Sequence, residues 1–466
     1  MVRVEYDPMG SVEVPSEKYW GAQTQRALLN FRISSKKWDD EIIKSIILIK
    51  KAAAEVNHEL GLLDQLKYEL IVKACDTLLN NWEKYKDNFP LDVFQTGSGT
   101  STNMNVNEVI ANLASELAGK ERGSKFIHPN DDVNKGQSSN DVIPTSIRIA
   151  SYKMAIRLIR KIRELIDIFK VKEKEFEGII KTGRTHLMDA TPIRLSQEFS
   201  GYRRQLELSV ERISEVFKRI RELPIGGTAV GTGINTHKEF GRRVAEKINT
   251  YLENEIDFSV YPRFIEAINH FEAQSTIDAV IELVGSLKIY CLALMKITND
   301  IRWMGSGPVG GIGELLLPEL QPGSSIMPGK VNPVIPEAVG MACSYCIGLE
   351  YSLIVANQYS NFELSTTFPL AGLVISDCFN ILLNLTETVG EKLIKGLKPN
   401  LERIESIVNF NPSVVTPLAK VLGYDKAYEI VKKALKERMS IKEYCIKYNV
   451  LKLEEAEELL DLEKMV

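Results

Sequence analysis

The sequence predicts a mainly α-helical protein built around a bundle of long helices. Apolar residues recur at every third or fourth position over unusually long stretches, which is the spacing of one helix face. The alternation of apolar and polar residues that is typical of strands is scarce. Polar, glycine-containing loops separate the long stretches, so we expect several long helices to pack against one another as a bundle.

Five stretches carry this helical pattern, and the clearest is Ser196–Leu223. Its apolar positions are Phe199, Tyr202, Leu206, Val210, Ile213, Phe217, Ile220 and Leu223. The other four stretches are Ile149–Ile180, Ala267–Arg302, Pro333–Gln358 and Pro369–Ile394. Pro369 stands early in its helix, where proline is tolerated. The residues from Ile281 to Leu294 leave little polar face, which indicates burial on all sides and favours association between subunits.

The same pattern divides the chain into three expected domains. A mixed, mostly helical N-terminal domain covers residues 1–136, the long-helix bundle covers 137–397, and a small helical domain covers 398–466. Each length lies within the usual range for a domain.

Composition narrows the class of protein. The chain has 466 residues, 44% of them hydrophobic and 26% charged, with a formal net charge of -4. Lysine and arginine are interspersed with glutamate, so a nucleic-acid partner is not expected. No apolar run in the sequence suggests a membrane span, and the N-terminus lacks the apolar core of a signal peptide. We therefore expect a cytoplasmic protein that binds no membrane.

The sequence offers no pattern for a metal or an organic cofactor. Only Cys343 and Cys346 form a Cys-x-x-Cys pair, and because they lie in a helical pattern we expect buried thiols. The five histidines have no ligand-like spacing. The run Gly305–Gly310 fits Gly-x-Gly-x-x-Gly, but it follows a helical pattern rather than a strand. A site without metal or cofactor is predicted.

The most informative loop is Gly323–Asn332, because it gathers hydroxyl, ammonium and amide groups between glycines. Lys330 and Asn332 are suitable partners for a carboxylate. Ser324 or Ser325 is a candidate proton acceptor, provided that nearby donors stabilise the alkoxide. The alternative is a mobile polar surface loop.

Two more polar loops precede helices. The loop Thr96–Asn105 combines hydroxyls with a helix start, which suits either an anion or simple N-capping. The loop His128–Asp141 places Ser138, Ser139 and Asn140 just before a long helix, where side-chain and backbone donors favour a carboxylate.

Two further loops complete the set. Gly183–Pro192 contains His186, which a carboxylate partner would orient and make more basic. The loop Gly226–Asn235 is glycine-rich like a phosphate cradle, but it lacks the Gly-Lys-Ser/Thr ending of nucleotide-binding loops.

Together these motifs resemble those of the fumarase/aspartase superfamily. The resemblance rests on the loop Gly-Ser-Ser-Ile-Met-Pro-Gly-Lys-Val-Asn at 323–332, the run Ser-Ser-Asn at 138–140 and the pair Thr185–His186. It extends in order from Tyr19–Arg26 to Gly423–Ala427. The resemblance implies a homotetramer whose central helices merge into a twenty-helix core, with each active site shared among three subunits.

The resemblance also implies roles for individual residues. Ser324 is the expected base, Lys330 stabilises the charge that develops, and His186 pairs with Glu337. The expected substrate-binding residues are Ser98, Thr100, Ser138, Ser139, Asn140, Thr185, Lys330 and Asn332. A second, surface dicarboxylate site is implied at His128, Asn130 and Asp131.

The implied substrate is a small C4 dicarboxylate, and the implied reaction is the addition or elimination of water at fumarate. The runs 226–233, 189–192, 301–303 and 361–364 resemble class II fumarases. One difference is Ser365–Thr366, where those proteins usually have Asn-Val. Aspartate ammonia-lyase is the alternative, and a non-catalytic structural member of the superfamily is a remote one.

Overall fold

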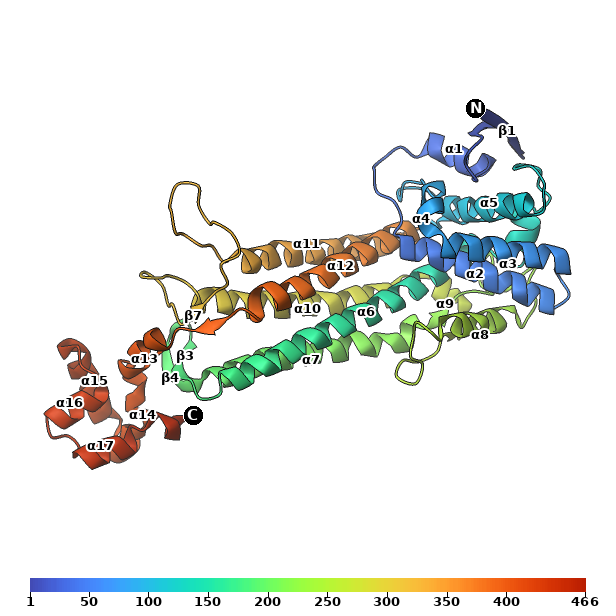
Figure 1. The fold of residues 1–466 in the computed structure, drawn as a ribbon. Coiled ribbons are helices and arrows are strands. Elements are labelled where there is room, and N and C mark those ends of the chain that lie inside the picture. Colours follow the sequence, from blue (N-terminus) through green and yellow to red (C-terminus); the bar gives the residue numbers. More distant parts are fainter. The chain divides into compact units, whose positions relative to one another are not determined.

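The computed structural model describes residues 1–466 and is mainly helical (Figure 1). Five long helices dominate it: α6 (Ser139–Glu175), α7 (Leu195–Ile220), α10 (Asp278–Met304), α11 (Val334–Ala356) and α12 (Phe368–Thr388). A π-helical segment, η4 (Val389–Ile394), extends α12. The predicted fold class, a bundle of long helices, is confirmed.

Two of the predicted helices have wrong boundaries. Helix α6 begins at Ser139, ten residues before the predicted start at Ile149, and the predicted end at Ile180 lies in a strand. Pro144 lies inside α6 as its sixth residue, and because it has no backbone N–H it cannot make the usual helical hydrogen bond there. The predicted helix from Ala267 is broken, because Thr276 has extended backbone angles and separates α9 (His270–Ser275) from α10.

The chain forms two compact units, each assembled from separate stretches of sequence. Unit 1 comprises residues 1–159, 211–288 and 345–382, and unit 2 comprises residues 160–210, 289–344 and 383–466. Each unit therefore contains part of every one of the five long helices. The three-domain division that the sequence predicts stays a prediction.

Buried aromatic residues pack the long helices together within each unit. In unit 1, Tyr152 of α6 lies 4.3 Å, centroid to centroid, from Phe217 of α7. In unit 2, Phe169 of α6 lies 5.8 Å from Phe199 of α7. All four side chains are at most 2% exposed. Such pairs bury large apolar areas and fix how the helices are rotated against each other.

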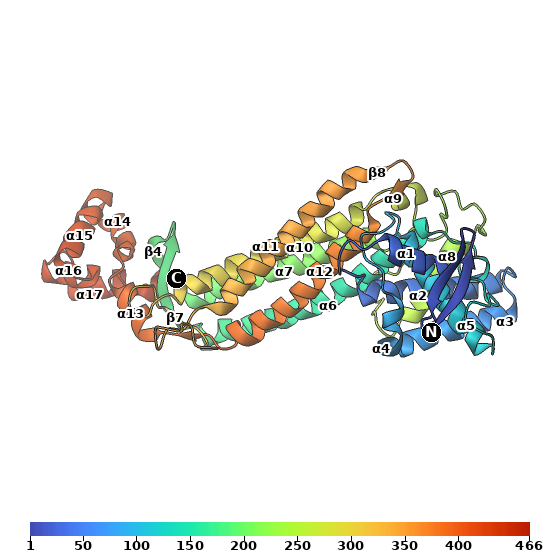
Figure 2. The same ribbon diagram turned by 90° about the horizontal axis from the view of Figure 1, so that it is seen from above.

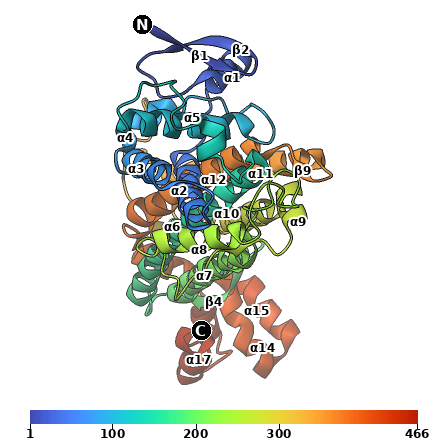
Figure 3. The same cartoon turned by 90° about the vertical axis from the view of Figure 1, so that its right-hand side faces the viewer.

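Unit 1 also contains the N-terminal elements, where α2 packs against α3 and against α8 from the middle of the chain (Figures 1 and 3). Aspartates begin two of these helices, since Asp39 accepts from Glu41 N and Asp64 from Lys67 N. The helices of this unit are α1 (Ala22–Asn30), α2 (Asp40–Glu59), α3 (Gln65–Asn80), α4 (Trp82–Tyr85), α5 (Thr100–Leu117), α8 (Phe240–Leu252) and α9. Its strands are β1 (Val2–Asp7), β2 (Gly10–Pro15), β5 (Glu222–Leu223), β6 (Ile265–Glu266), β8 (Ser360–Asn361) and β9 (Leu364–Ser365).

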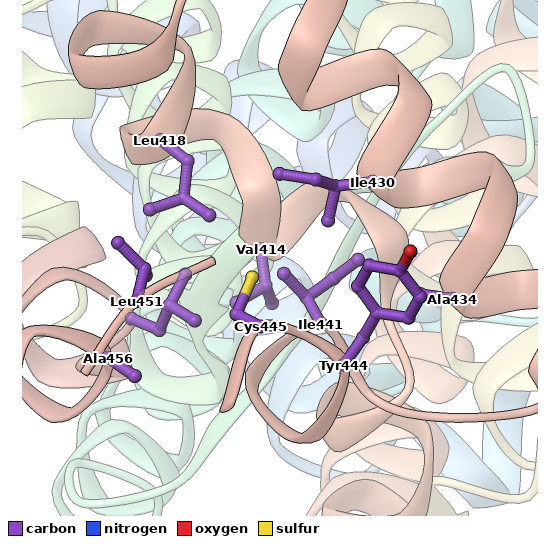
Figure 4. Packing of buried hydrophobic residues seen from close by; sticks show 10 residues of the cluster. Val414, Leu418, Ile430, Ala434, Ile441, Tyr444, Cys445, Leu451 and Ala456 are labelled. Carbon is purple, nitrogen blue, oxygen red and sulfur yellow. The ribbon is translucent and has the colours of Figure 1, made fainter. Parts of the chain in front are cut away.

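Unit 2 contains a hairpin, β3 (Ile180–Thr185) and β4 (Met188–Arg194), and the short pair β7 (Leu315–Leu316) and β10 (Lys398–Pro399). The C-terminal helices of the unit, seen together in Figure 2, are α13 (Leu401–Asn409), α14 (Thr416–Leu422), α15 (Tyr424–Glu437), α16 (Ile441–Lys447) and α17 (Leu453–Leu459). They enclose a small apolar core of their own, which includes Leu418, Ile430 and Ile441 (Figure 4).

Helices α11 and α12 are the most apolar elements of the chain. By length and composition alone both are able to cross a membrane, contrary to the expectation from the sequence. The core helices of soluble proteins satisfy the same criterion, and most of α12 is buried. Helix α11 contains Cys343 and Cys346, both buried as expected, but it exposes Met341 and Tyr351 at 70% and 68%.

Candidate active site

A cluster of three hydroxyl groups forms where helices α5 and α6 begin. Thr100 Oγ1 lies 2.7 Å from Ser98 Oγ and 2.7 Å from Ser139 Oγ. Thr100 and Ser139 are the first residues of the two helices. The first N–H groups of a helix lack partners within it, and the helix dipole favours negative charge there. Two helix starts and three hydroxyls therefore make this cluster a suitable site for a carboxylate.

The predicted neighbours of Ser139 are held in place by buried groups. Asn140 donates from Nδ2 to the carbonyl oxygen of Ala229 at 2.7 Å. Asp141, which is fully buried, accepts from Ser138 N at 2.9 Å and from Thr228 N at 2.9 Å. The glycine-rich loop Gly226–Asn235, which resembles a phosphate cradle in sequence, thus packs against the start of α6. Its carbonyl and N–H groups fix Asn140 and Asp141.

A buried lysine that the sequence analysis missed supports the preceding residues. Lys50 of α2 is 0% exposed and donates to Asn134 Oδ1 at 2.8 Å and to Gln137 Oε1 at 2.9 Å. Burial lowers the pKa of Lys50 to about 7, while the nearby Asp141 carboxylate opposes this shift. The segment before Ser138 is therefore anchored to the interior of unit 1.

The loop that contains Ser98 is also tightly packed. The α-carbon of Gly97 lies so close to the backbone of Thr366 that a β-carbon would overlap the Thr366 carbonyl group. Ser365, which is buried, bonds through Oγ to Ser360 and Thr367. The residues Ser365–Thr366, the one difference in the resemblance, thus lie directly behind this loop.

In unit 2, the loop Gly323–Asn332 directs backbone donors at one serine. Ser324 Oγ accepts from Met327 N at 3.0 Å and from Ile326 N at 3.2 Å. These are the backbone donors that a serine base needs to stabilise its alkoxide. The structure gives the exposed Ser325 hydroxyl no hydrogen bond. Ser324 Oγ, unlike Ser325 Oγ, thus has two backbone donors, and its role as proton acceptor stays a prediction.

The rest of this loop is closed by its own backbone and by Asn332. Gly323 N donates to Lys330 O at 2.9 Å, and Asn332 Nδ2 donates to Gly323 O at 2.8 Å. In this structure the Asn332 amide thus holds the loop together, and its predicted contact with a carboxylate stays a prediction. Lys330 is exposed, so its ammonium group is available to an anion.

His186 lies in the tight turn between β3 and β4. Thr185 pairs with Met188, so His186 and Leu187 are the only two residues of the turn. Both have positive φ, 57° and 60°, as in a type I′ turn. This conformation is uncommon for residues other than glycine, and it is less favourable for Leu187 than for His186, because histidine adopts it more often than most residues. His186 is exposed, and the structure contains no hydrogen bond between it and Glu337 in the first turn of α11.

The predicted site residues thus fall into two groups. Ser98, Thr100, Ser138, Ser139 and Asn140 belong to unit 1, where the hydroxyl cluster unites three of them. The residues Thr185, His186, Ser324, Lys330, Asn332 and Glu337 belong to unit 2.

The predicted second site lies at the short π-helical segment η2 (Pro129–Val133). His128 Nδ1 accepts from Asn130 N at 3.2 Å and from Asp131 N at 3.1 Å. His128 and Asn130 also line a cavity of about 250 Å³ whose other walls include Glu108 and Lys125. A dicarboxylate at this place stays a prediction.

Comparisons with known proteins agree on one family. A family model described as lyase matches residues 10–348, and one described as fumarase C C-terminus matches residues 414–466. The class II fumarate hydratase of Thermus thermophilus is 45% identical over 461 residues, covering 98% of this chain and 97% of its own. That of Helicobacter pylori is 43% identical over 466 residues, covering 100% and 98%.

Solved structures show the same similarity. The class II fumarase of Schistosoma mansoni superposes with a TM-score of 0.95 at 36% identity, covering 100% of this chain and 99% of that one. A protein from Brucella melitensis described as fumarate lyase:delta crystallin, bound to cobalt, superposes with a TM-score of 0.94 at 37% identity, covering 100% and 99%.

Proposed function

Because the chain belongs to the class II fumarate hydratase family of lyases, we propose that it catalyses the reversible hydration of fumarate to malate. The observation that carries this proposal is the loop Gly323–Asn332, in which two backbone N–H groups point at Ser324 Oγ. The tricarboxylic acid cycle and the cytoplasm are the setting that we propose for this activity.

In the direction from malate, the proposed reaction begins at the carbon next to one carboxylate. Ser324, as an alkoxide held by the N–H groups of Ile326 and Met327, removes a proton from C3 of malate. The electron pair moves onto the adjacent carboxylate, where Lys330 stabilises the added negative charge. The hydroxyl cluster of Ser98, Thr100 and Ser139 is suited to holding a substrate carboxylate.

The second half of the reaction expels the hydroxyl group. The C2–O bond breaks while the electron pair forms the double bond, so the departing hydroxide needs a proton. His186, polarised by Glu337, is suited to supply it, directly or through one water. Hydration of fumarate runs through the same steps in reverse.

Product analysis tests this function directly. Purified protein incubated with fumarate should form malate, and adding ammonium should produce no aspartate. Malate is quantified by chromatography or by proton NMR in both incubations. If aspartate forms and malate does not, the protein is an aspartate ammonia-lyase instead. If no product forms, the enzymatic proposal is wrong.

We also propose that the protein is a homotetramer with active sites shared among subunits. Helix α11 has almost no polar face, and it exposes Met341, Tyr345 and Tyr351 by 70%, 49% and 68%. Exposed apolar surface of this kind is typical of a subunit interface. Covering it in a tetramer accounts for its composition without a membrane, and would bring residues of both units from different subunits into one site.

A subunit-mixing experiment tests the shared site. Ser324→Ala and His186→Asn, each inactive, are unfolded together in equal amounts and reassembled. If each site takes its serine and its histidine from different subunits, about a quarter of the sites in random tetramers regain both residues. Activity should therefore return to roughly that fraction of wild type.

The matched control mixes Ser324→Ala with Lys330→Ala in the same way. Both residues lie on one loop, so every loop keeps one defect and no activity should return. If neither mixture recovers, although native gels show mixed tetramers, each site is built within one subunit and the shared-site proposal is wrong.

A further inference from the structure

A fully buried carboxylate lies beneath the hairpin that contains His186. Glu314 is 0% exposed, and its two oxygens accept from the two terminal nitrogens of Arg184 at 2.7 and 2.8 Å. Lys181, only 1% exposed, lies 3.2 Å from the same carboxylate and 3.1 Å from that of Glu198. Two cations and two carboxylates thus form a balanced cluster inside unit 2. None of these groups has a role in the proposed reaction.

The backbone of Glu314 is itself fixed. Its carbonyl oxygen accepts from Asn400 N at 2.9 Å, and the carbonyl of Gly313 accepts from Asn400 Nδ2 at 3.0 Å. The next residues, Leu315–Leu316, pair with Lys398–Pro399 as β7 and β10. Glu314 is therefore a rigid point of attachment for whatever its side chain binds.

The Glu314 side chain binds Arg184 on strand β3, and this strand leads into the turn that contains His186. Arg184 stands two residues before His186, and its side chain is the last one on β3 that is bonded to the interior. Beyond it, Thr185, His186 and Leu187 are all exposed. Both residues of the turn adopt left-handed backbone angles, which persist only when the surrounding structure imposes them.

The opposite strand, β4, is held by Asn411 and Ser413, and Asn411 also donates to Thr182 Oγ1 of β3 at 3.2 Å. Asn411 Nδ2 donates to the carbonyl of Ala190 at 2.7 Å, and Ser413 Oγ lies 3.3 Å from the carbonyl of Asp189. The hairpin is thus gripped from both strands. On the β3 side, Lys181 and Arg184 both contact the buried Glu314 carboxylate, and Arg184 is the one nearer to the turn.

We propose that Glu314 and Arg184 are positioning residues that set the place of His186, and hence the efficiency of proton delivery to the leaving hydroxide. This inference rests on the proposed function. The planar guanidinium of Arg184, bonded through both terminal nitrogens, fixes the orientation of the side chain as well as its distance from Glu314. A lysine ammonium group would fix only the distance. Small displacements of a proton donor lower the rate of its step, whereas binding by the hydroxyl cluster is untouched.

The test is Arg184→Lys, which keeps the buried positive charge but loses the two-nitrogen contact. Steady-state kinetics with malate and fumarate should show kcat lowered on the order of ten- to a hundred-fold. KM should change less than kcat, because the hydroxyl cluster and the loop Gly323–Asn332 are unchanged, and Thr185 is the only expected substrate-binding residue on the displaced hairpin. The matched control is Arg26→Lys, which alters the two-nitrogen contact of Arg26 with Asp7 in unit 1 and should leave both constants unchanged.

A double-mutant cycle separates positioning from simple structural support. In a His186→Asn background, Arg184→Lys should lower the residual kcat no further, because the group that it positions is already absent. If the two effects multiply, or if folded Arg184→Lys has normal kcat, the inference is wrong. Should Arg184→Lys fail to fold, Glu314→Gln takes its place with the same expectations.

Failure of the proposed function is seen in a different measurement. A wild-type protein that makes no malate from fumarate contradicts the function before any variant is compared. An active wild type with an indifferent Arg184 contradicts only the positioning role.

Discussion

Replacing Ser324 by alanine should lower kcat by about a hundred- to ten-thousand-fold while KM changes little. The change removes the proposed proton acceptor but leaves the hydroxyl cluster and Lys330 to hold the substrate. The loss can exceed the range for an ordinary general base, because the serine is useful only with the two N–H donors that surround its oxygen. Initial rates are measured with fumarate and with malate.

The neighbouring serine provides the matched control. Ser325→Ala removes an exposed hydroxyl for which the structure contains no hydrogen bond, and it should keep near-normal kcat. If Ser325→Ala abolishes activity and Ser324→Ala does not, the other hydroxyl is the base. If neither matters, the reaction does not use a serine base.

Replacing Lys330 by alanine should damage both kinetic constants. The ammonium group contacts a substrate carboxylate in the ground state, so KM should rise by about ten- to a hundred-fold, the worth of a charged hydrogen bond. It also stabilises the charge that develops on that carboxylate, so kcat should fall on the order of a hundred- to a thousand-fold. This double effect distinguishes Lys330 from Ser324.

An exposed lysine of the same unit controls for net charge. Lys392→Ala removes one positive charge from α12's extension η4 and should leave both constants unchanged. A Lys330→Ala variant with altered KM and normal kcat would limit Lys330 to substrate binding. If Lys330→Ala has normal kcat and normal KM, Lys330 does not belong to the active site.

Much of the candidate site could be predicted from the sequence because its parts are local. Ser324, Lys330 and Asn332 lie within nine residues of one another, and Ser139 stands at a helix start whose donors follow from backbone geometry. The start of α6 was predicted too late because a polar run and Pro144 are typical of a loop. The first helical turn tolerates the polar run, since its N–H groups have no helical partners, whereas Pro144 lies in the second turn, where proline is unfavourable.

The supporting groups could not be predicted, because their partners are far away in the chain. Glu314 bonds to Arg184 across 130 residues, and Lys50 reaches Asn134 across 84. A weak signal does exist for Lys50, which continues the apolar positions Ile42 and Ile46 along one face of α2. A lysine on a buried stripe indicates a buried partner but not which one.

The central claim is that Ser324 transfers the proton between the protein and C3 of malate. Deuterium incorporation at C3 of malate tests this claim most directly. Wild-type protein equilibrated with fumarate in D₂O should yield malate with one deuterium at C3, detected by NMR. Ser324→Ala at the same concentration should form that malate at least about a hundred-fold more slowly, while Ser325→Ala should match wild type. Deuterated malate formed by Ser324→Ala at the wild-type rate would contradict the account.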